Sequence, residues 1–167
     1  MAGTFDPEAF GFLIFDLYRL IRSDMDQRIA AAGIGITPGE ARTLVHAARA
    51  GEVRQNVLAE RMGLEAMTLS AYLERLERQG LVERLADETD RRAKLIRLTD
   101  KSTAVLEAIV SLGKEVRLKA RGSMSDEEWE ALQQTLKRIR SNFGPPAPEE
   151  AAAPAGKLDP IFGNRDA

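Results

Sequence analysis

Gly63 and Gly80 divide the stretch Arg54–Arg97 into three segments, and few folds contain segments of these kinds in this order. The first segment favours a short helix that ends at the turn-prone Gly63. A longer helix should follow, because three leucines at spacings of four and three fall on one helical face. These leucines are Leu69, Leu73 and Leu76. Gly80 stands where a left-handed cap would end this helix.

Two short apolar runs flank a polar loop after Gly80. The runs Leu81–Leu85 and Lys94–Leu98 and the loop Ala86–Arg92 predict a β-hairpin, and Glu52-Val53 can add a short strand. A helix, a tight turn, a second helix and a hairpin form a winged helix-turn-helix, whose second helix enters a DNA major groove. We therefore predict a mainly α fold with a small β-wing.

Several short motifs follow one another along this stretch: Leu58-Ala59, Leu76-Glu77, Gly80-Leu81-Val82, Arg84, Asp90-Arg91-Arg92 and Leu98-Thr99. With these motifs the chain resembles MarR-type transcriptional regulators over about residues 10–143. The resemblance implies a homodimer that binds a pseudo-palindromic operator in double-stranded DNA, more often as a repressor. It also implies a small effector, often aromatic or an acyl thioester, bound between the DNA-binding and dimerisation parts.

Composition limits the other functions. The chain has 167 residues, which is the size of one domain, and a formal net charge of −2. Residues 53–98 carry nine basic and eight acidic side chains, so charge alone would not indicate a DNA-binding protein. Because the chain has no cysteine and one histidine, we expect no disulfide, metal site or cofactor. The acidic residues fall in helix caps and on charged helix faces, so we do not expect the protein to be an enzyme.

Targeting signals are not evident. Charged residues interrupt every apolar run, so no membrane span is expected, and the start MAGTFDPEAF lacks the pattern of a secretion signal. We therefore expect a cytoplasmic protein.

Two amphipathic helices are predicted before the DNA-binding core. Asp6-Pro7-Glu8 is typical of a helix start, and apolar residues then recur at threes and fours to about Ala32. Those residues are Phe10, Ile14, Leu17, Ile21, Met25 and Ile29. Thr37 and Glu40 form a capping box that should open a second helix, which ends near Ala50.

Two further helices are predicted after the hairpin. Thr99 is the expected N-cap of a long helix that ends at Gly122, and a capping box from Ser125 to Glu128 should open the last helix. The apolar residues of that last helix form a narrow, near-heptad stripe, which favours a partner helix. The stripe contains Trp129, Leu132, Leu136, Ile139 and Phe143.

These patterns predict a single winged helix-turn-helix regulator domain in residues 1–143. Its DNA-binding core is expected at 53–98, between dimerisation helices at about 6–32 and 99–143. Residues 144–167 hold five of the seven prolines. This Pro/Ala-rich tail has too little apolar surface to fold by itself, so we expect it to be disordered.

The second helix of the core supplies the expected base contacts. Residues near its N-terminus reach base edges in this geometry. Thr68 and Ser70 can form hydrogen bonds, and Met67 and Ala71 can contact a thymine methyl group. Many members of the family that the chain resembles carry a long basic or polar residue where Ala66 or Ala71 stands, so we predict modest direct readout of an A·T-leaning site.

Phosphate contacts are expected from four side chains: Arg54, Gln55, Arg75 and Arg78. The alternative for each arginine is a solvated helix face with a partner one turn away, as in the pair Glu74–Arg78.

The wing supplies a second kind of contact. By resemblance, Arg92 matches the arginine that family members insert into the minor groove, and Asp90 matches the acid that orients it; Arg91 is a further candidate. A narrow A·T minor groove has an enhanced negative potential that attracts a guanidinium. Asp87 and Glu88 at the tip oppose approach to phosphate, so the arginine must project beyond them.

An effector site is expected beside the first helix, where aromatic walls and cations would suit an anionic ligand. The candidates are Phe12, Phe15, Tyr18, Arg19, Arg22 and His46. The alternatives are that the aromatic residues are core residues and that His46 is a packed or surface residue.

Two other functions stay open from sequence. One is a DNA-binding protein without a small-molecule switch. The other is a winged helix that contacts only protein, which the balanced charge of residues 53–98 leaves possible. Steeply salt-dependent binding to duplex DNA would exclude the second.

Overall fold

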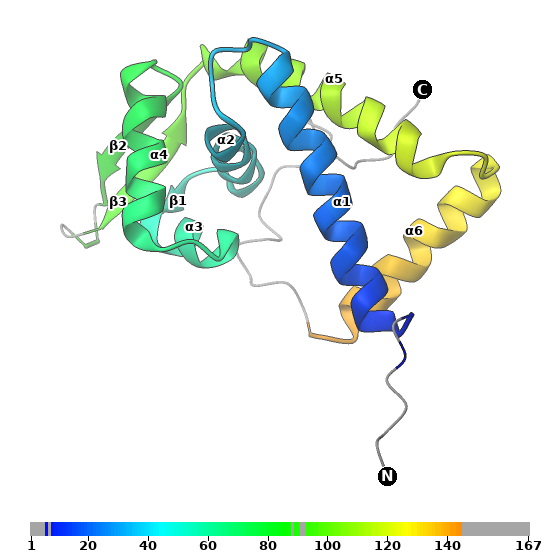
Figure 1. Ribbon diagram of the computed structural model, residues 1–167. Helices are drawn as coiled ribbons and strands as arrows, with labels where there is room; N and C mark the ends of the chain where they lie inside the picture. The colour runs from blue at the N-terminus through cyan, green and yellow to red at the C-terminus, as the bar shows by residue number, and fades with distance from the viewer. Residues whose placement is uncertain (1–5, 7, 88, 91–92, 145–167) are drawn as a thin grey trace.

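The computed structural model describes residues 6, 8–87, 89–90 and 93–144. In chain order the elements are α1 Phe10–Ala31, α2 Pro38–Ala50, β1 Val53–Arg54, α3 Gln55–Met62, α4 Ala66–Arg78, β2 Val82–Ala86, β3 Lys94–Leu98, α5 Ser102–Arg121 and α6 Asp126–Ser141. Helices α2, α3 and α4 form one end of the molecule with the sheet, and α1, α5 and α6 form the other (Figure 1). The predicted mainly α fold with a small β-wing is confirmed.

The sheet is antiparallel, and β3 is its central strand. Ile96 of β3 lies opposite Val53 of β1 on one side and Arg84 of β2 on the other. The additional strand predicted at Glu52-Val53 is confirmed as β1, but it begins one residue later, at Val53. β2 also begins one residue late, at Val82, because the backbone N–H of Leu81 donates to the Leu76 carbonyl and closes the end of α4 (2.9 Å).

The core lies where α4 meets α2, α3 and the sheet. All three leucines of the predicted α4 stripe are fully buried, together with Leu44 of α2, Leu58 of α3 and Ile96 of β3. Gly80 has φ 71°, so the predicted left-handed helix cap is confirmed. One face of α4 is thus fixed in the core, and the opposite face stays in solvent.

Ion pairs hold α1 against α5. The carboxylate of Asp24 accepts from Arg28 on its own helix (2.7 Å) and from Lys119 on α5. Arg28 also pairs with Glu115 of α5. Hydrogen bonds from Arg28 and Lys119 hold the pKa of the Asp24 carboxyl below its usual range.

Two helix starts differ from the prediction. α1 begins at Phe10 instead of Asp6, because the Asp6 carboxylate accepts the N–H of Glu8 (2.9 Å) in a separate turn. α5 begins at Ser102, and Thr99 is not its N-cap. The Thr99 hydroxyl donates instead to the Gly80 carbonyl (2.6 Å) and ties the end of α4 to the end of the wing.

The start of α6 agrees with the prediction. Both bonds of the Ser125–Glu128 capping box are present, and Gly122 ends α5 with φ 57°. However, α6 has no buried residue, and its apolar Leu132 and Leu136 are exposed.

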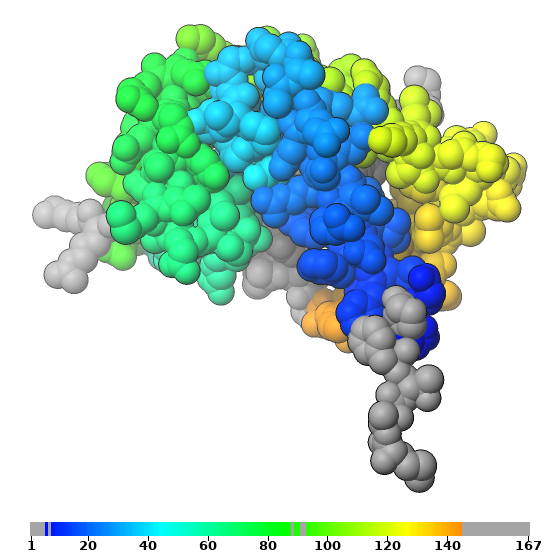
Figure 2. Space-filling model, in the orientation of Figure 1, coloured from blue at the N-terminus to red at the C-terminus, as the bar shows by residue number. Residues whose placement is uncertain are grey.

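The N-terminal half of α1 is also exposed. Of its predicted stripe, Met25 and Ile29 are buried, whereas Phe10, Ile14 and Leu17 are exposed. Figure 2 shows this end of α1, in dark blue, at the margin of the molecule. Its exposed apolar and aromatic side chains are Phe10, Phe12, Leu13, Ile14, Phe15, Leu17, Tyr18 and Leu20.

No helix within the described residues is both long and apolar enough to cross a lipid bilayer. Except for Gly144, the tail that we predict to be disordered lies outside the described residues, as do Arg91 and Arg92 of the wing.

Candidate nucleic-acid interface

The N-terminal turn of α4 presents an exposed surface. The Met67 side chain is 86% exposed, and Thr68 and Ala66 are exposed beside it. Ser70 and Ala71 follow one turn later and are half-buried. The structure therefore brings together all four predicted base-contacting residues on one end of a helix whose other face is core.

Arg78 extends this surface towards the C-terminal end of α4. It is exposed, and it forms no ion pair within the part of the chain that the structure describes. The considered pair with Glu74 is not formed there; Glu74 accepts instead from the Ser70 hydroxyl (3.3 Å). Arg78 can therefore still contact phosphate.

Arg75 has a different position, between α4 and α2. Its Nε donates to Glu40 of α2, whose side chain is 2% exposed, and its guanidinium lies over the Tyr72 ring, 5.4 Å from the centroid. The same ring packs against Gly39, where an added Cβ would lie 2.5 Å from the Tyr72 Cζ. Arg75, which the sequence predicts to contact phosphate, thus fixes α4 on the first turn of α2.

The Glu40 carboxylate has two bonded neighbours. It accepts the backbone N–H of Thr37 (2.8 Å) in the predicted capping box, and it pairs with Arg75. Burial raises the pKa of Glu40, and the Thr37 N–H and Arg75 together lower it by more, so the net direction is downward.

Arg54 links the start of α3 to the wing. Its Nε donates to the Asp87 carboxylate (2.6 Å) and its Nη2 to the Thr89 hydroxyl (2.9 Å). Gln55, the first residue of α3, is half-buried beside it in the chain. Both residues lie at the helix end where phosphate contacts were predicted, but the Arg54 guanidinium is held by the wing.

Asp87 is the residue of this region whose role the sequence interpretation missed. From the sequence alone, this acid is predicted only to oppose the approach of the wing to phosphate. In the structure its carboxylate also accepts the N–H of Thr89 (2.7 Å), the Thr89 hydroxyl (2.7 Å) and the N–H of Asp90 (3.1 Å). An aspartate two residues before a threonine is a typical Asx-turn signal, and it could have been found. Asp90 is exposed, and the arginines that follow it lie outside the described residues.

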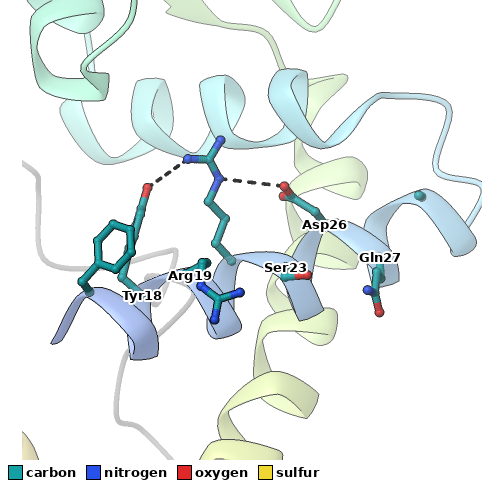
Figure 3. Close-up of a pocket in the computed structure, with 8 residues that line it drawn as sticks. Tyr18, Arg19, Ser23, Asp26 and Gln27 are labelled. Atoms are coloured by element: carbon teal, nitrogen blue, oxygen red, sulfur yellow. Dashed lines mark hydrogen bonds and ion pairs between the residues drawn. The ribbon is translucent and has the colours of Figure 1, made fainter. Parts of the chain in front are cut away.

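A shallow hollow on α1 gathers four of the predicted effector residues (Figure 3). Phe15, Tyr18, Arg19 and Arg22 line it, with Ser23, Asp26, Gln27 and Ala30. Every lining residue belongs to α1, so the hollow has one wall. Phe12 lines a neighbouring hollow with Phe15, and His46 of α2 lines neither.

Arg22 crosses the hollow between two partners. Its Nη1 donates to the Tyr18 hydroxyl (3.2 Å), and its Nε lies 3.9 Å from Asp26 (Figure 3). Asp26 in turn pairs with Arg42 of α2. One edge of the hollow is thereby connected to α2, at the end of the molecule that contains the helix-turn-helix. The described residues contain no cluster of three or more metal-binding side chains.

Comparison with known proteins identifies the relatives of this arrangement. A family model described as the MarR family matches residues 34–93, which run from α2 to the wing loop. The solved structure of transcriptional regulator PA3341 is 36% identical, with a TM-score of 0.65, over 80% of this chain and 97% of that one. The chain belongs to the MarR family.

More distant MarR-family structures share the fold. A MarR transcriptional regulator from Methanosarcina mazei Go1 is 24% identical, with a TM-score of 0.71, over 81% of this chain and 96% of that one. Wild-type MarR from E. coli in its apo form is 22% identical, with the same TM-score, over 81% and 98%. MarR-family proteins are transcriptional regulators that bind DNA and typically act as dimers, and they are generally not enzymes.

Proposed function

We propose that this MarR-family chain is a cytoplasmic, homodimeric repressor that binds a pseudo-palindromic operator in double-stranded DNA. Residues 1–143 act as one regulator unit. The observation that carries the proposal is the division of α4, whose apolar face is buried while its N-terminal turn presents the polar Thr68 and the apolar Met67 to solvent. A helix that ends in this way is suited to contact base edges.

Exposed apolar surface supports the dimer. A helix that is apolar on every side is normally buried on every side. The N-terminal half of α1 approaches that composition, since Asp16 and Arg19 are its only charged residues before Arg22, and α6 carries an apolar stripe with no buried residue. A second copy would cover both surfaces, and its two-fold axis would place the two α4 helices on half-sites about 34–36 Å apart.

Replacing Arg92 with alanine is expected to weaken operator binding roughly 10- to 100-fold, because one minor-groove arginine contributes about 1–3 kcal/mol. The measurement is a mobility-shift titration at two salt concentrations against the promoter region beside the protein's own gene. Sedimentation should show an unchanged dimer.

Arg97→Ala is the matched control. Arg97 lies on β3 of the same wing, but its guanidinium pairs with Glu83 (2.7 Å) and Glu52 (3.4 Å). It should bind DNA nearly as wild type does. Unchanged affinity of the Arg92 variant would show that the wing stays out of the groove. No salt-sensitive binding by the wild-type dimer would favour a winged helix that contacts only protein.

We place the effector site in the hollow of α1. Aromatic Phe15 and Tyr18 and cationic Arg19 and Arg22 suit an aromatic carboxylate or another small anionic aromatic ligand. The second wall of this one-sided hollow would come from the partner copy. Such a ligand would compete with Asp26 for Arg22 and so act on the contact between α1 and α2.

Replacing Arg22 with methionine is expected to leave operator affinity unchanged and to reduce the response to aromatic carboxylates. For the wild type, benzoate and larger phenolic acids should lower operator affinity by about tenfold, a typical coupling between two sites. The readout is the operator titration with and without the acid. Arg49→Met, on an exposed position of α2, is the control. An equal response of both variants would place the ligand elsewhere, and no response of the wild type to the panel would favour a regulator without this switch.

A further inference from the structure

Arg54, Asp87 and Thr89 form a closed group of hydrogen bonds, which we term the wing clamp. Arg54 donates to both other residues, and Thr89 donates its hydroxyl and its backbone N–H to Asp87. The Asp87 side chain is 8% exposed and the Arg54 side chain 42% exposed. The acid is therefore the buried centre of the clamp, and the arginine covers it from the solvent side.

The clamp joins the two parts of the molecule that approach DNA. Arg54 is the N-cap of α3, the first helix of the helix-turn-helix, and it lies opposite Leu95 in the sheet. Asp87 follows the last residue of β2, and its backbone N–H donates to the Ala93 carbonyl across the hairpin (3.3 Å). The segment that leads to Arg91 and Arg92 therefore starts from a turn tied to the helix-turn-helix.

The energetics oppose a change of partner for Arg54. If its guanidinium left Asp87 for a phosphate, a buried carboxylate would lose its cation, which is costly. The bonds from Thr89 and Arg54 hold the pKa of Asp87 far below its ordinary value, so this carboxylate is charged at neutral pH. The positive charge of Arg54 is thus largely neutralised before DNA arrives.

We propose that the wing clamp is a positioning element for DNA readout, in which Asp87 and Arg54 fix the wing relative to α4 so that both enter their grooves together. Arg54 then acts through Asp87 instead of as a direct phosphate contact. This inference rests on the proposed DNA-binding function. It concerns residues that touch the wing turn, not the bases.

Replacement of Asp87 by asparagine separates positioning from simple electrostatics. Asparagine has nearly the same shape, but its neutral amide cannot form the ion pair with Arg54. The substitution also removes a negative charge from the DNA-binding face, which by itself would tighten binding to phosphate. We expect the opposite result, an operator affinity at least about tenfold lower, because the minor-groove contact is misplaced.

The control and the second variant test the same point. Glu83→Gln removes one negative charge and one ion pair, with Arg97, from the wing outside the clamp, and it should bind no more weakly than wild type. Arg54→Met combined with Asp87→Asn should be no weaker than Asp87→Asn alone, since the two residues act as one unit. Hydrogen exchange of the Thr89 and Asp90 amides, both donors to Asp87, should quicken in the Asp87 variant. If that variant does not fold, Thr89→Val replaces the hydroxyl that bonds Arg54 and Asp87 with a methyl group and should weaken binding in the same direction.

The contrary outcomes are distinct. An Asp87→Asn protein that binds as tightly as the wild type or more tightly, or losses that add in the double variant, would overturn the clamp and restore Arg54 as an independent phosphate contact. If the wild type itself shows no specific, salt-sensitive binding, the proposed function fails, and the inference fails with it.

Discussion

Replacing Arg75 with methionine is expected to lower the free energy of unfolding by about 3 kcal/mol. The substitution leaves the Glu40 carboxylate, at 2% exposed, without its cation. The value lies at the low end of the range for a broken buried pair, because Arg75 is partly exposed and the Thr37 N–H still contacts Glu40. Urea unfolding without DNA measures it.

The difference in unfolding free energy between the wild type and the Arg75 variant should depend on pH in a definite direction. In the wild type the pKa of Glu40 is lowered in the fold, so its stabilisation is present above the unfolded pKa and is lost as pH falls through the folded one. Without Arg75 the pKa of Glu40 rises from its wild-type value, because burial remains and one of the groups that lower the pKa is lost. The difference in unfolding free energy between the two proteins should therefore shrink as pH falls from about 7 to about 4.

Arg78→Met is the matched control on the same helix. Arg78 is exposed, so its replacement should change stability by no more than about 0.5 kcal/mol. Equal, small effects of both substitutions would mean that Arg75 does not stabilise the contact between α4 and α2.

Replacing Leu136 with aspartate is expected to raise the dimer dissociation constant by about 1000-fold. The substitution removes a leucine worth about 1.5–3 kcal/mol from an apolar surface, and two-fold symmetry repeats the loss in each copy. Leu17→Asp on α1 should act in the same way, because both leucines are exposed in the single chain. Sedimentation equilibrium measures the constant, and operator affinity should fall with it.

Lys137→Asp places the same aspartate side chain one residue away on α6, off the apolar stripe, and should leave the dimer intact although it changes the charge by more. Circular dichroism should show that each variant keeps its helices, since Leu136 and Leu17 make no part of the buried core. Wild-type sedimentation of both leucine variants would exclude these helices as the interface.

Features that depend on near neighbours were predictable from sequence. The Thr37–Glu40 and Ser125–Glu128 capping boxes, the buried stripe of α4 and the glycine helix ends all involve residues within one or two turns. Periodicity and turn chemistry are sufficient to indicate such features.

Features that depend on distant neighbours were not predictable. Arg75 meets Glu40 across 35 positions, and Arg54 meets Asp87 across 33. A sequence pattern shows an arginine on a helix surface, but it does not show which element lies above that surface. The prediction of Thr99 as the N-cap of α5 was wrong for the same reason, because its hydroxyl donates to the distant Gly80 carbonyl.

The division of α4 also determines how such a regulator can acquire new specificity. Ala66, Met67 and Thr68 are exposed and contribute nothing to the core, which the leucines on the opposite face hold together. Substitutions there should cost at most about 0.5 kcal/mol of stability, so the site can vary by drift or in a designed library while the fold persists. Duplicated copies of such a gene can therefore diverge in their target sequences through a few changes in a single helical turn.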